Sequence, residues 1–574
     1  MINLKINGID VEAKEGSTVL DAAKEYGFDI PTLCYYPDLR INSDCRVCSV
    51  EVAGSNHLMT ACSTPVKEGM EVKTNTSKVY NARKTITELI LANHDTNCTT
   101  CARNLNCELQ DLANTLGIEE NRFEKVLEMD AVDDHNPSIY RNPNRCIKCG
   151  RCIEVCKDVE GTYVLENQGR SNEVKVAPKY GKYLSEEDCT FCGQCASVCP
   201  VAAITEKDDT QRVFDAINNP NKHVIVQVAP AIRVAIGEEF GHKSGGQWTG
   251  QLITALKRLG FDRVFDTDFT ADLTIIEEGH ELLERVKTGG TLPMMTSCCP
   301  GWINYAEQQH PDMLEHLSTC KSPQQMFGAL AKTYYAQSSG IDPSDMYVVS
   351  IMPCTAKKYE AGREEMQSNE GMQDVDAVLT TRELAKMIRS QGINFNNLKD
   401  GEFDTPFGIT TGAAAIFGAT GGVMEAALRT VSEVVNEKPL EKIEFEDVRG
   451  FDGIKEATVE LGGNPVKVAV AHTLKHAETL ISEVKAGKSD YAFIEVMTCP
   501  GGCIGGGGQP YGTTNKKRIE RIESTYRVDD SMPVRKSHEN PTIQKLYDDF
   551  LEKPLGKKSH NLLHTHYHPR HKKV

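Results

Sequence analysis

The spacing of the cysteines is the feature that most constrains this chain. Its 574 residues include 21 cysteines, and most lie only three or four positions from the next. The odd count and the short spacings argue against a disulfide-stapled secreted protein and favour thiolates that bind metal in a reducing compartment. The first residues, MINLKINGID, contain neither the basic nor the apolar region of a signal peptide. We therefore expect a cytoplasmic metalloprotein.

Composition excludes several other classes. Hydrophobic residues make up 40% and charged residues 25%, which excludes disordered, collagen-like and coiled-coil chains. The net charge of -17 lacks the basic footprint of a nucleic-acid-binding protein. No run of about 18 apolar residues occurs, so we expect no membrane-spanning helix. The length alone suggests about four domains.

The first 80 residues are predicted to form a β-grasp, ferredoxin-like domain. Alternating apolar residues over 2–6 and an Asn7-Gly8 turn predict a hairpin. A helix is expected over 18–26, with Ser17 as its N-cap. The spacing C-x10-C-x2-C-x13-C is similar to the plant-type 2Fe–2S pattern, although its first gap is longer. The predicted ligands are Cys34, Cys45, Cys48 and Cys62.

Residues 81–125 are predicted to form a small helical domain that binds a second cluster. An apolar-striped helix is expected over 81–93, followed by four closely spaced ligands: His94, Cys98, Cys101 and Cys107. Taken alone, a Cys3His set suggests structural zinc, which stays the alternative. The neighbouring iron–sulfur motifs favour a 4Fe–4S cluster with one imidazole ligand.

Residues 126–209 carry the strongest local signal, an α+β two-cluster ferredoxin pattern. The run C-x2-C-x2-C-x3-C occurs twice, and the fourth cysteine of each run serves the other cluster in such proteins. One 4Fe–4S cluster is therefore assigned to Cys146, Cys149, Cys152 and Cys199, and the other to Cys156, Cys189, Cys192 and Cys195. Clusters in series indicate an electron path that leads to a redox centre.

The remaining residues, 210–574, are predicted to form an α/β domain with parallel sheets. Apolar runs at 224–228, 292–295, 346–352 and 493–497 are typical of strands buried on both faces. The last three runs end at or beside cysteines, and ligands bind at the carboxyl ends of strands in such sheets. These thiols should converge, and we expect Cys299, Cys354, Cys499 and Cys503 to hold a further cluster.

Three motifs in this domain carry a resemblance. TSCCPGW at 296–302, MPCTAKK at 352–358 and FIEVMTCPGGCIGGGGQP at 493–510 resemble the signature motifs of the FeFe-hydrogenases. With its N-terminal domains, the chain resembles the single-chain clostridial type over almost its whole length. The resemblance implies an H-cluster, in which a 4Fe–4S cubane shares the Cys503 thiolate with a diiron centre that carries CO, CN and azadithiolate. It also implies reversible reduction of protons to molecular hydrogen, by hydride formation at the diiron centre, with electrons from reduced ferredoxin.

The resemblance also assigns residues around the H-cluster. It implies a proton relay through Cys298, Glu278, Ser318, Glu281 and Arg285. Lys357 resembles the residue that hydrogen-bonds a cyanide, and the diiron lining corresponds to Ala229, Pro230, Gln324, Met352, Phe417 and Met497.

Three features fall outside this pattern. Ala231 stands where relatives have Ser, and Cys320 stands where they have Ala. Cys320 is either a small buried apolar residue or a second thiol near the relay that alters inactivation by oxygen. The histidine-rich end, from His560 to His571, is expected to be flexible and basic.

The resemblance implies a monomer that exchanges electrons with ferredoxin or flavodoxin and depends on maturase enzymes for its diiron unit. One alternative is a non-catalytic relative that senses hydrogen or assembles iron–sulfur clusters. Sensory relatives tend to lose the relay thiol, whereas Cys298 is present. A second alternative is an electron-transfer subunit like those of respiratory complexes or formate dehydrogenases, which would lack the three C-terminal motifs.

Overall fold

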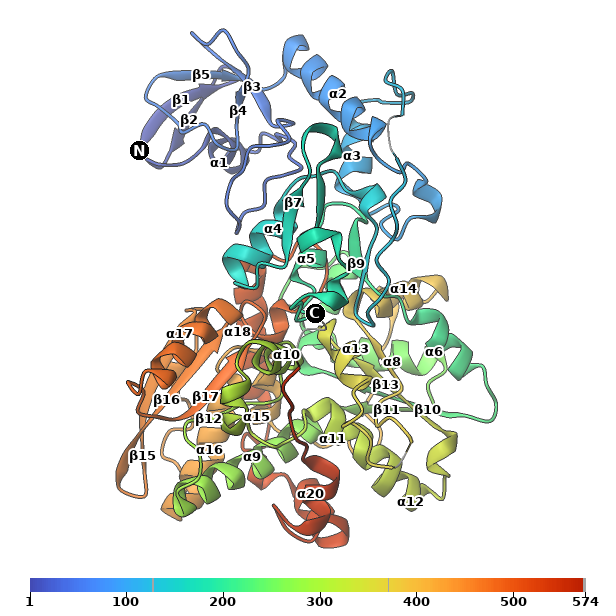
Figure 1. The fold of residues 1–574 in the computed structure, drawn as a ribbon, viewed down its shortest axis with the longest axis vertical. Coiled ribbons are helices and arrows are strands. Elements are labelled where there is room, and N and C mark those ends of the chain that lie inside the picture. The colour runs from blue at the N-terminus through green and yellow to red at the C-terminus, as the bar shows by residue number, and fades with distance from the viewer. Residues whose placement is uncertain (126–127, 370, 571–574) are drawn as a thin grey trace.

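The computed structural model describes residues 1–125, 128–369 and 371–570, and a five-stranded sheet forms its N-terminal unit (Figure 1). The strand order is β2-β1-β5-β3-β4. The bounds are Ile2–Ile6 for β1, Ile9–Ala13 for β2, Ser49–Val52 for β3, Met59–Thr60 for β4 and Met70–Lys73 for β5. Asn7 and Gly8 both adopt positive φ, as a tight hairpin turn requires, so the predicted hairpin is confirmed.

The first helix, α1 (Val19–Glu25), corrects the predicted N-cap. Thr18, not Ser17, occupies that position. Its hydroxyl accepts the Asp21 amide at 3.2 Å, and the Asp21 carboxylate accepts the Thr18 amide at 3.0 Å. This reciprocal capping box satisfies two backbone donors, which favours Thr18 over its neighbour.

The next two units link the N-terminal sheet to the larger C-terminal region (Figure 1). The first contains α2 (Ser77–Ala92) and α3 (Glu108–Thr115). The second contains the helices α4 (Arg151–Glu154) and α5 (Gln194–Ser197) and two antiparallel pairs: β6 (Ile139–Arg141) with β9 (Ile204–Glu206), and β7 (Leu165–Gln168) with β8 (Lys175–Pro178). Gly150 and Gly193, both at positive φ, precede α4 and α5.

Two four-stranded sheets organise the C-terminal region. The order β11-β10-β13-β14 is parallel throughout, and in β12-β17-β16-β15 only β15 is antiparallel. The bounds are His223–Val228 for β10, Arg263–Asp266 for β11, Met294–Met295 for β12, Met346–Ile351 for β13, Ala377–Leu379 for β14, Ile454–Leu461 for β15, Asn464–His472 for β16 and Tyr491–Met497 for β17. Each of the four predicted apolar runs overlaps a strand, and the parallel sheets are confirmed.

Helices cover both sheets and fill the space between them. They are α6 (Thr210–Ile217), α7 (Pro230–Arg233), α8 (Thr249–Leu259), α9 (Asp268–Thr288), α10 (Pro300–Gln309), α11 (Pro323–Leu330), α12 (Ala336–Ser339), α13 (Ala356–Ala361), α14 (Thr381–Ser390), α15 (Gly412–Ala415), α16 (Gly422–Asn436), α17 (Leu474–Lys485), α18 (Asn515–Ser531), α19 (Pro541–Leu546) and α20 (Lys557–Leu563). The long helix α9 packs against α11 and α16. The helices within the described ranges include none with an apolar stretch of the length that a bilayer requires.

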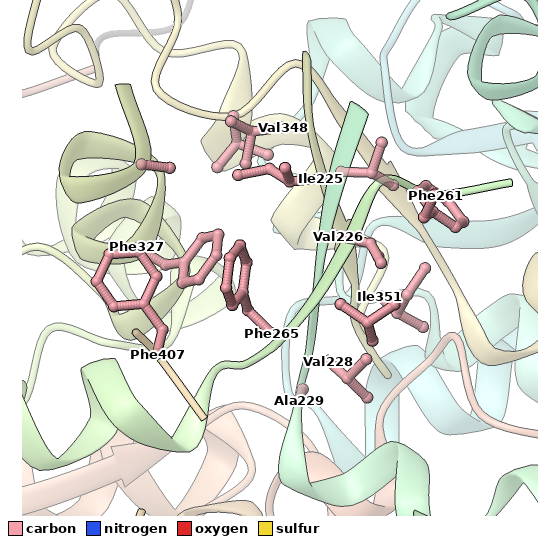
Figure 2. Packing of buried hydrophobic residues seen from close by; sticks show 14 of the residues in the cluster. Ile225, Val226, Val228, Ala229, Phe261, Phe265, Phe327, Val348, Ile351 and Phe407 are labelled. Atoms are coloured by element: carbon pink, nitrogen blue, oxygen red, sulfur yellow. The ribbon is translucent and has the colours of Figure 1, made fainter. Parts of the chain in front are cut away.

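Aromatic and branched side chains form the largest core around the first of these sheets. Phe265, Phe327 and Phe407 lie close together in Figure 2. Their ring centroids are 5.3 to 5.8 Å apart. Val228 packs in the same cluster at the end of β10, directly before Ala229. This rigid packing fixes the strand end from which the site is built.

The C-terminal segment differs from its prediction. The Lys321 amide donates to the Leu563 carbonyl at 2.7 Å, and the Thr565 amide donates to the Thr319 carbonyl at 2.8 Å. His564 is only 8% exposed. The expected flexible end is therefore wrong for residues up to 570, because backbone pairing holds this segment against the domain. His571 lies outside the described residues.

Candidate active site and electron path

Strand ends from both sheets meet at one cavity. Cys298 and Cys299 follow β12, Cys354 follows β13, and Cys499 and Cys503 follow β17. All five thiols line the same cavity. Parallel strands place their carboxyl ends at one edge, and this explains how residues about 200 positions apart come together.

The predicted pocket residues line this cavity too. They are Ala229, Pro230, Gln324, Met352, Lys357, Phe417 and Met497, with the divergent Ala231 beside them. Six other lining residues were not predicted individually: Thr267, Pro300, Pro323, Pro353, Gly418 and Thr498. Gly502 and Gly506 also line the cavity. Thr498 could have been suspected from its place beside Cys499. Its hydroxyl accepts a hydrogen bond from the Cys299 thiol at 3.2 Å.

The thiols of the cavity are hard to ionise without a cation. Burial raises the pKa of Cys354 to about 12 and raises the pKa values of Cys499 and Cys503, and neighbouring thiols add to each effect. Several buried thiolates close together would repel one another unless positive charge lay between them. This donor set therefore fits an iron centre.

Lys357 brings a fixed positive charge to the cavity. Its ammonium donates to both oxygens of Glu360, at 3.1 and 2.9 Å, and to the Cys298 carbonyl at 3.0 Å. Burial alone would lower the pKa of Lys357, but the Glu360 carboxylate outweighs it and raises that pKa. The Oε1 atom of Gln324 is buried and has no hydrogen-bond partner among the described residues. The positive Lys357 side chain suits a bound anionic group, whereas the unpaired Gln324 oxygen would accept a hydrogen bond from a donor.

Glycines let the surrounding loops approach closely. Gly501 and Gly502 adopt φ of +77° and +88°. A Cβ on Gly506 would lie 2.2 Å from the Pro353 carbonyl oxygen, and one on Gly507 would lie 2.2 Å from that of Cys192. Only glycine fits at such contacts. The second contact presses the Cys503 loop against the cysteine-rich unit.

Hydrogen bonds join three of the five predicted relay residues, Ser318, Glu281 and Arg285. Glu278, Glu281 and Arg285 all belong to α9. The Ser318 hydroxyl donates to Glu281 Oε2 at 3.0 Å, and Arg285 Nη2 donates to Glu281 Oε1 at 2.6 Å. Electrostatic repulsion from Glu278 helps to raise the pKa of Cys298, after burial, so the two groups are near neighbours.

Glu278 is the unusual acid of this series. It is 2% exposed, and its Oε2 has no hydrogen-bond partner among the described residues. Burial, followed by the nearby Glu281 carboxylate, raises the pKa of Glu278 to about 8. A carboxyl with this pKa can both accept and release a proton near neutral pH.

Several of the remaining cysteines lie near other members of their predicted sets. Cys146, Cys149, Cys152 and Cys199 line one small cavity. Electrostatic coupling links Cys195 to Cys189, Cys156 and Cys192. In the N-terminal unit the Cys48 thiol lies 3.3 Å from that of Cys62, and side-chain hydrogen bonding joins Cys34 to Cys45.

The His94 side chain has two properties of a metal-binding imidazole. Its Nδ1 atom is buried without a hydrogen-bond partner among the described residues. Burial lowers the pKa of His94 to about 4, so the imidazole is neutral near pH 7. A neutral ring with a free nitrogen is the form that binds metal.

Comparison with known proteins agrees with this arrangement. Residues 222–507 match the family "Iron only hydrogenase large subunit, C-terminal domain", and 515–570 match "Iron hydrogenase small subunit". Upstream, 1–77 match a 2Fe-2S iron-sulfur cluster binding domain, 83–122 an NADH-ubiquinone oxidoreductase-G iron-sulfur binding region, and 145–203 a 4Fe-4S dicluster domain.

Similar proteins cover the whole chain. The NADP-reducing hydrogenase subunit HndD of Solidesulfovibrio fructosivorans is 50% identical over 99% of both chains. Iron hydrogenase 1 of Clostridium pasteurianum is 41% identical over 99% of this chain and 100% of its own. A solved structure of a HydA1 FeFe-hydrogenase variant from Chlamydomonas reinhardtii matches 63% of this chain and 99% of that chain, with 43% identity and a TM-score of 0.58. The chain belongs to the iron-only, or FeFe, hydrogenase family.

Proposed function

We propose that this chain interconverts protons, electrons and molecular hydrogen at an H-cluster. The cluster would be held by Cys299, Cys354, Cys499 and Cys503, with Cys503 shared between the cubane and the diiron unit. One observation carries the proposal: five thiols, one paired lysine and a largely apolar wall surround a single cavity. When bound, the H-cluster supplies the redox chemistry that joins protons and electrons as hydrogen.

The protein residues would position the group and exclude water. Met352, Phe417 and Met497 present apolar surface to the cavity. The Lys357 ammonium, held by Glu360, would face a cyanide, and the free Gln324 oxygen lies on the same wall. Ala231 offers no hydroxyl there, so the contact expected from a Ser is missing.

Protons would travel from Arg285 through Glu281, Ser318 and Glu278 to Cys298. The hydrogen bonds from Arg285 to Glu281 and from Ser318 to Glu281 form the outer half of this path. Glu278, with a pKa of about 8, lies between that half and the cavity. Because Glu278 is close to half-protonated near that pH, it can serve both directions of the reaction.

Electrons would pass through one 2Fe–2S and three 4Fe–4S clusters. Cys45, Cys107, Cys146 and Cys199, which come from three successive units, pack around one apolar cluster of side chains. The start of α5 and the loop before it are hydrogen-bonded to the cavity loops, because Gln194 donates to the Gly505 carbonyl at 2.8 Å and Thr355 donates to the Phe191 carbonyl at 2.7 Å. These contacts support an unbroken path to the cavity.

An iron cluster suits the His94 set better than zinc. Among the described residues, two groups of three His, Cys, Asp or Glu side chains have all their ligand atoms within 4.8 Å of one another. Neither group includes His94, Cys98, Cys101 or Cys107. A single zinc ion requires ligands about 2.0–2.3 Å from the metal, and hence close together. The wider separation fits a 4Fe–4S cluster.

The electron partner has two candidates. A ferredoxin or flavodoxin, with this chain as a monomer, follows from the resemblance to single-chain enzymes. The name of the HndD relative favours a second candidate, in which this chain is one subunit of an NADP-reducing complex. Native mass measurement and hydrogen-dependent reduction of ferredoxin and of NADP by the purified species would distinguish them.

Infrared spectroscopy of anaerobically matured protein tests the main proposal. Maturase enzymes should install the diiron unit, so Fe–CO and Fe–CN bands should appear and hydrogen should evolve with a reduced dye. Bands without any turnover would instead favour a hydrogen-sensing relative. Absence of both would refute the proposal, and intact iron–sulfur clusters without a diiron unit would favour the cluster-assembly alternative.

A further inference from the structure

A buried cluster of three metal-binding side chains lies beside the relay. The Cys320 thiol, a Glu281 carboxylate oxygen and a His564 ring nitrogen all lie within 4.8 Å of one another, and all three residues are buried. We infer that Cys320, Glu281 and His564 form a binding site for a zinc-like divalent cation, and that an ion bound there blocks the relay. The blocking effect rests on the proposed function, whereas the binding site does not.

Backbone pairing builds this cluster from distant parts of the chain. Cys320 and His564 face each other in an antiparallel bridge between the segment after Ser318 and the end of α20. Cys320 is fully buried, in agreement with one of the two sequence interpretations. Its Sγ atom also lies 3.9 Å from Glu281 Oε2, so it is a thiol next to the relay as well.

The surroundings of His564 resemble those of a metal-binding imidazole. Its Nε2 lies 3.1 Å from Glu277 Oε2, and Glu277 also accepts the Tyr547 hydroxyl at 2.5 Å and the Leu555 amide at 2.9 Å. Metal-bound histidines commonly donate their second N–H to such a carboxylate, which fixes the ring and its tautomer. Nδ1 is then the ligand atom, and it lies on the side of Thr319, 2.8 Å from its hydroxyl.

The three donors match the chemistry of zinc. Thiolate, imidazole and carboxylate are the ligands that zinc takes in proteins, and three protein ligands leave one further position. Binding would release the thiol proton of Cys320, because zinc binds the thiolate. The exposed His560 ring lies 4.3 Å from that of His564, which offers an entry point from the surface at α20.

A cation at this site would act on the proposed proton path. Arg285 holds Oε1 of Glu281, whereas Oε2 faces Cys320 and accepts the Ser318 hydroxyl. A divalent ion bound to Oε2 would occupy the oxygen that accepts the Ser318 proton. Hydrogen turnover would then fall while every cluster stayed intact.

X-ray absorption at the zinc edge tests the site in the fully clustered protein, because iron does not contribute at that energy. We expect one bound zinc with a single sulfur neighbour at about 2.3 Å. The sulfur signal should disappear in Cys320→Ala and persist in His566→Ala, an exposed control two residues from His564. Glu277→Gln should weaken zinc binding about 10–100-fold, and Cys320→Ala should weaken it more.

A second group of possible metal ligands, Glu433, His538 and Glu539, is less buried than the first and provides another control. Zinc bound there would lack sulfur and would depend on His538, not on Cys320. A zinc spectrum that is unchanged in Cys320→Ala, or no sulfur neighbour in wild type, would overturn the site.

Hydrogen evolution with added zinc tests the block separately. Micromolar zinc should inhibit wild type and His566→Ala, and at least ten times more zinc should be needed for Cys320→Ala. If zinc binds through sulfur but does not inhibit hydrogen evolution, the proposed inhibition is wrong and the proposed binding site is supported. If the enzyme evolves no hydrogen even without zinc, the proposed function fails and the absorption spectrum alone decides the site.

Discussion

Replacing Glu278 with Gln tests both the relay and the physical basis of its acid. Glutamine keeps the size of the side chain but can neither take up nor release the proton. General acid–base groups contribute about 10²–10⁴-fold to rates. We therefore expect hydrogen evolution and uptake to fall by about that factor, while the Fe–CO and Fe–CN bands persist.

The same variant has a stability signature whose sign can be worked out. The folded pKa of Glu278 is about 8 and its usual value is 4.5, so between these values the folded state binds more protons than the unfolded state. Stability from this group is therefore present below pH 4.5 and is lost as pH rises towards 8. Each pH unit corresponds to about 1.4 kcal/mol, so the full loss is about 5 kcal/mol.

Thermal unfolding of matched samples measures this loss. Wild type should lose about 3 kcal/mol between pH 6 and pH 9 relative to Glu278→Gln, because most of that interval lies below the folded pKa. Glu284→Gln, on the exposed face of the same helix, should follow wild type. If the stability difference does not change with pH, the raised pKa is wrong. If Glu278→Gln turns over at the wild-type rate, the relay through this residue is wrong.

Four further outcomes are expected. Cys298→Ser should keep its infrared bands but lose about 10²–10⁴-fold in turnover, because a hydroxyl gives up its proton far less readily than a thiol; wild-type turnover would exclude the thiol from the path. Lys357→Met leaves Glu360 as a buried charge and should lower stability by about 3–5 kcal/mol, with weaker infrared bands from a poorly held diiron unit; an unchanged melting midpoint would contradict the pairing. Phe407→Ala removes a fully buried ring and should cost about 3–5 kcal/mol in unfolding without changing turnover per intact cluster. Metal analysis of the mature chain should find about 20 iron atoms, and zinc in the His94 set would lower that figure by about four.

The sequence was sufficient for features that depend on local spacing. The four apolar runs predicted strands, and the position of each cysteine after its strand predicted that the thiols would meet at carboxyl ends of parallel strands, where such sheets bind ligands. The Asn7-Gly8 turn was equally readable, since positive φ at two successive positions favours these residues. Family motifs then supplied the relay and pocket residues, which spacing alone would not separate from surface charges or ordinary core.

Features that depend on long-range pairing could not be read in this way. The end of the chain looked basic and flexible because its histidines follow no hydrophobic period. Its placement depends on backbone hydrogen bonds between residues 563–565 and residues 319–321, about 245 positions earlier in the chain. The N-cap of α1 was missed for a smaller reason: Ser17 and Thr18 are both good caps, and the position of Asp21 decides between them.

One turn of α9 shows how neighbouring carboxyls acquire opposite proton preferences. Burial acts to raise the pKa of both Glu277 and Glu278. At Glu277 the effect of burial is outweighed by hydrogen bonds, which lower the pKa below its usual value; their donors are His564, Ser559, Tyr547 and the Leu555 amide. Glu278 has no such set of donors, so its pKa rises to about 8. Near pH 7 Glu277 is ionised and Glu278 is mostly protonated. Because a relay needs a group that changes protonation during turnover, Glu278 is the one of the pair that can carry the proton, and Glu277 can only hold its neighbours in place.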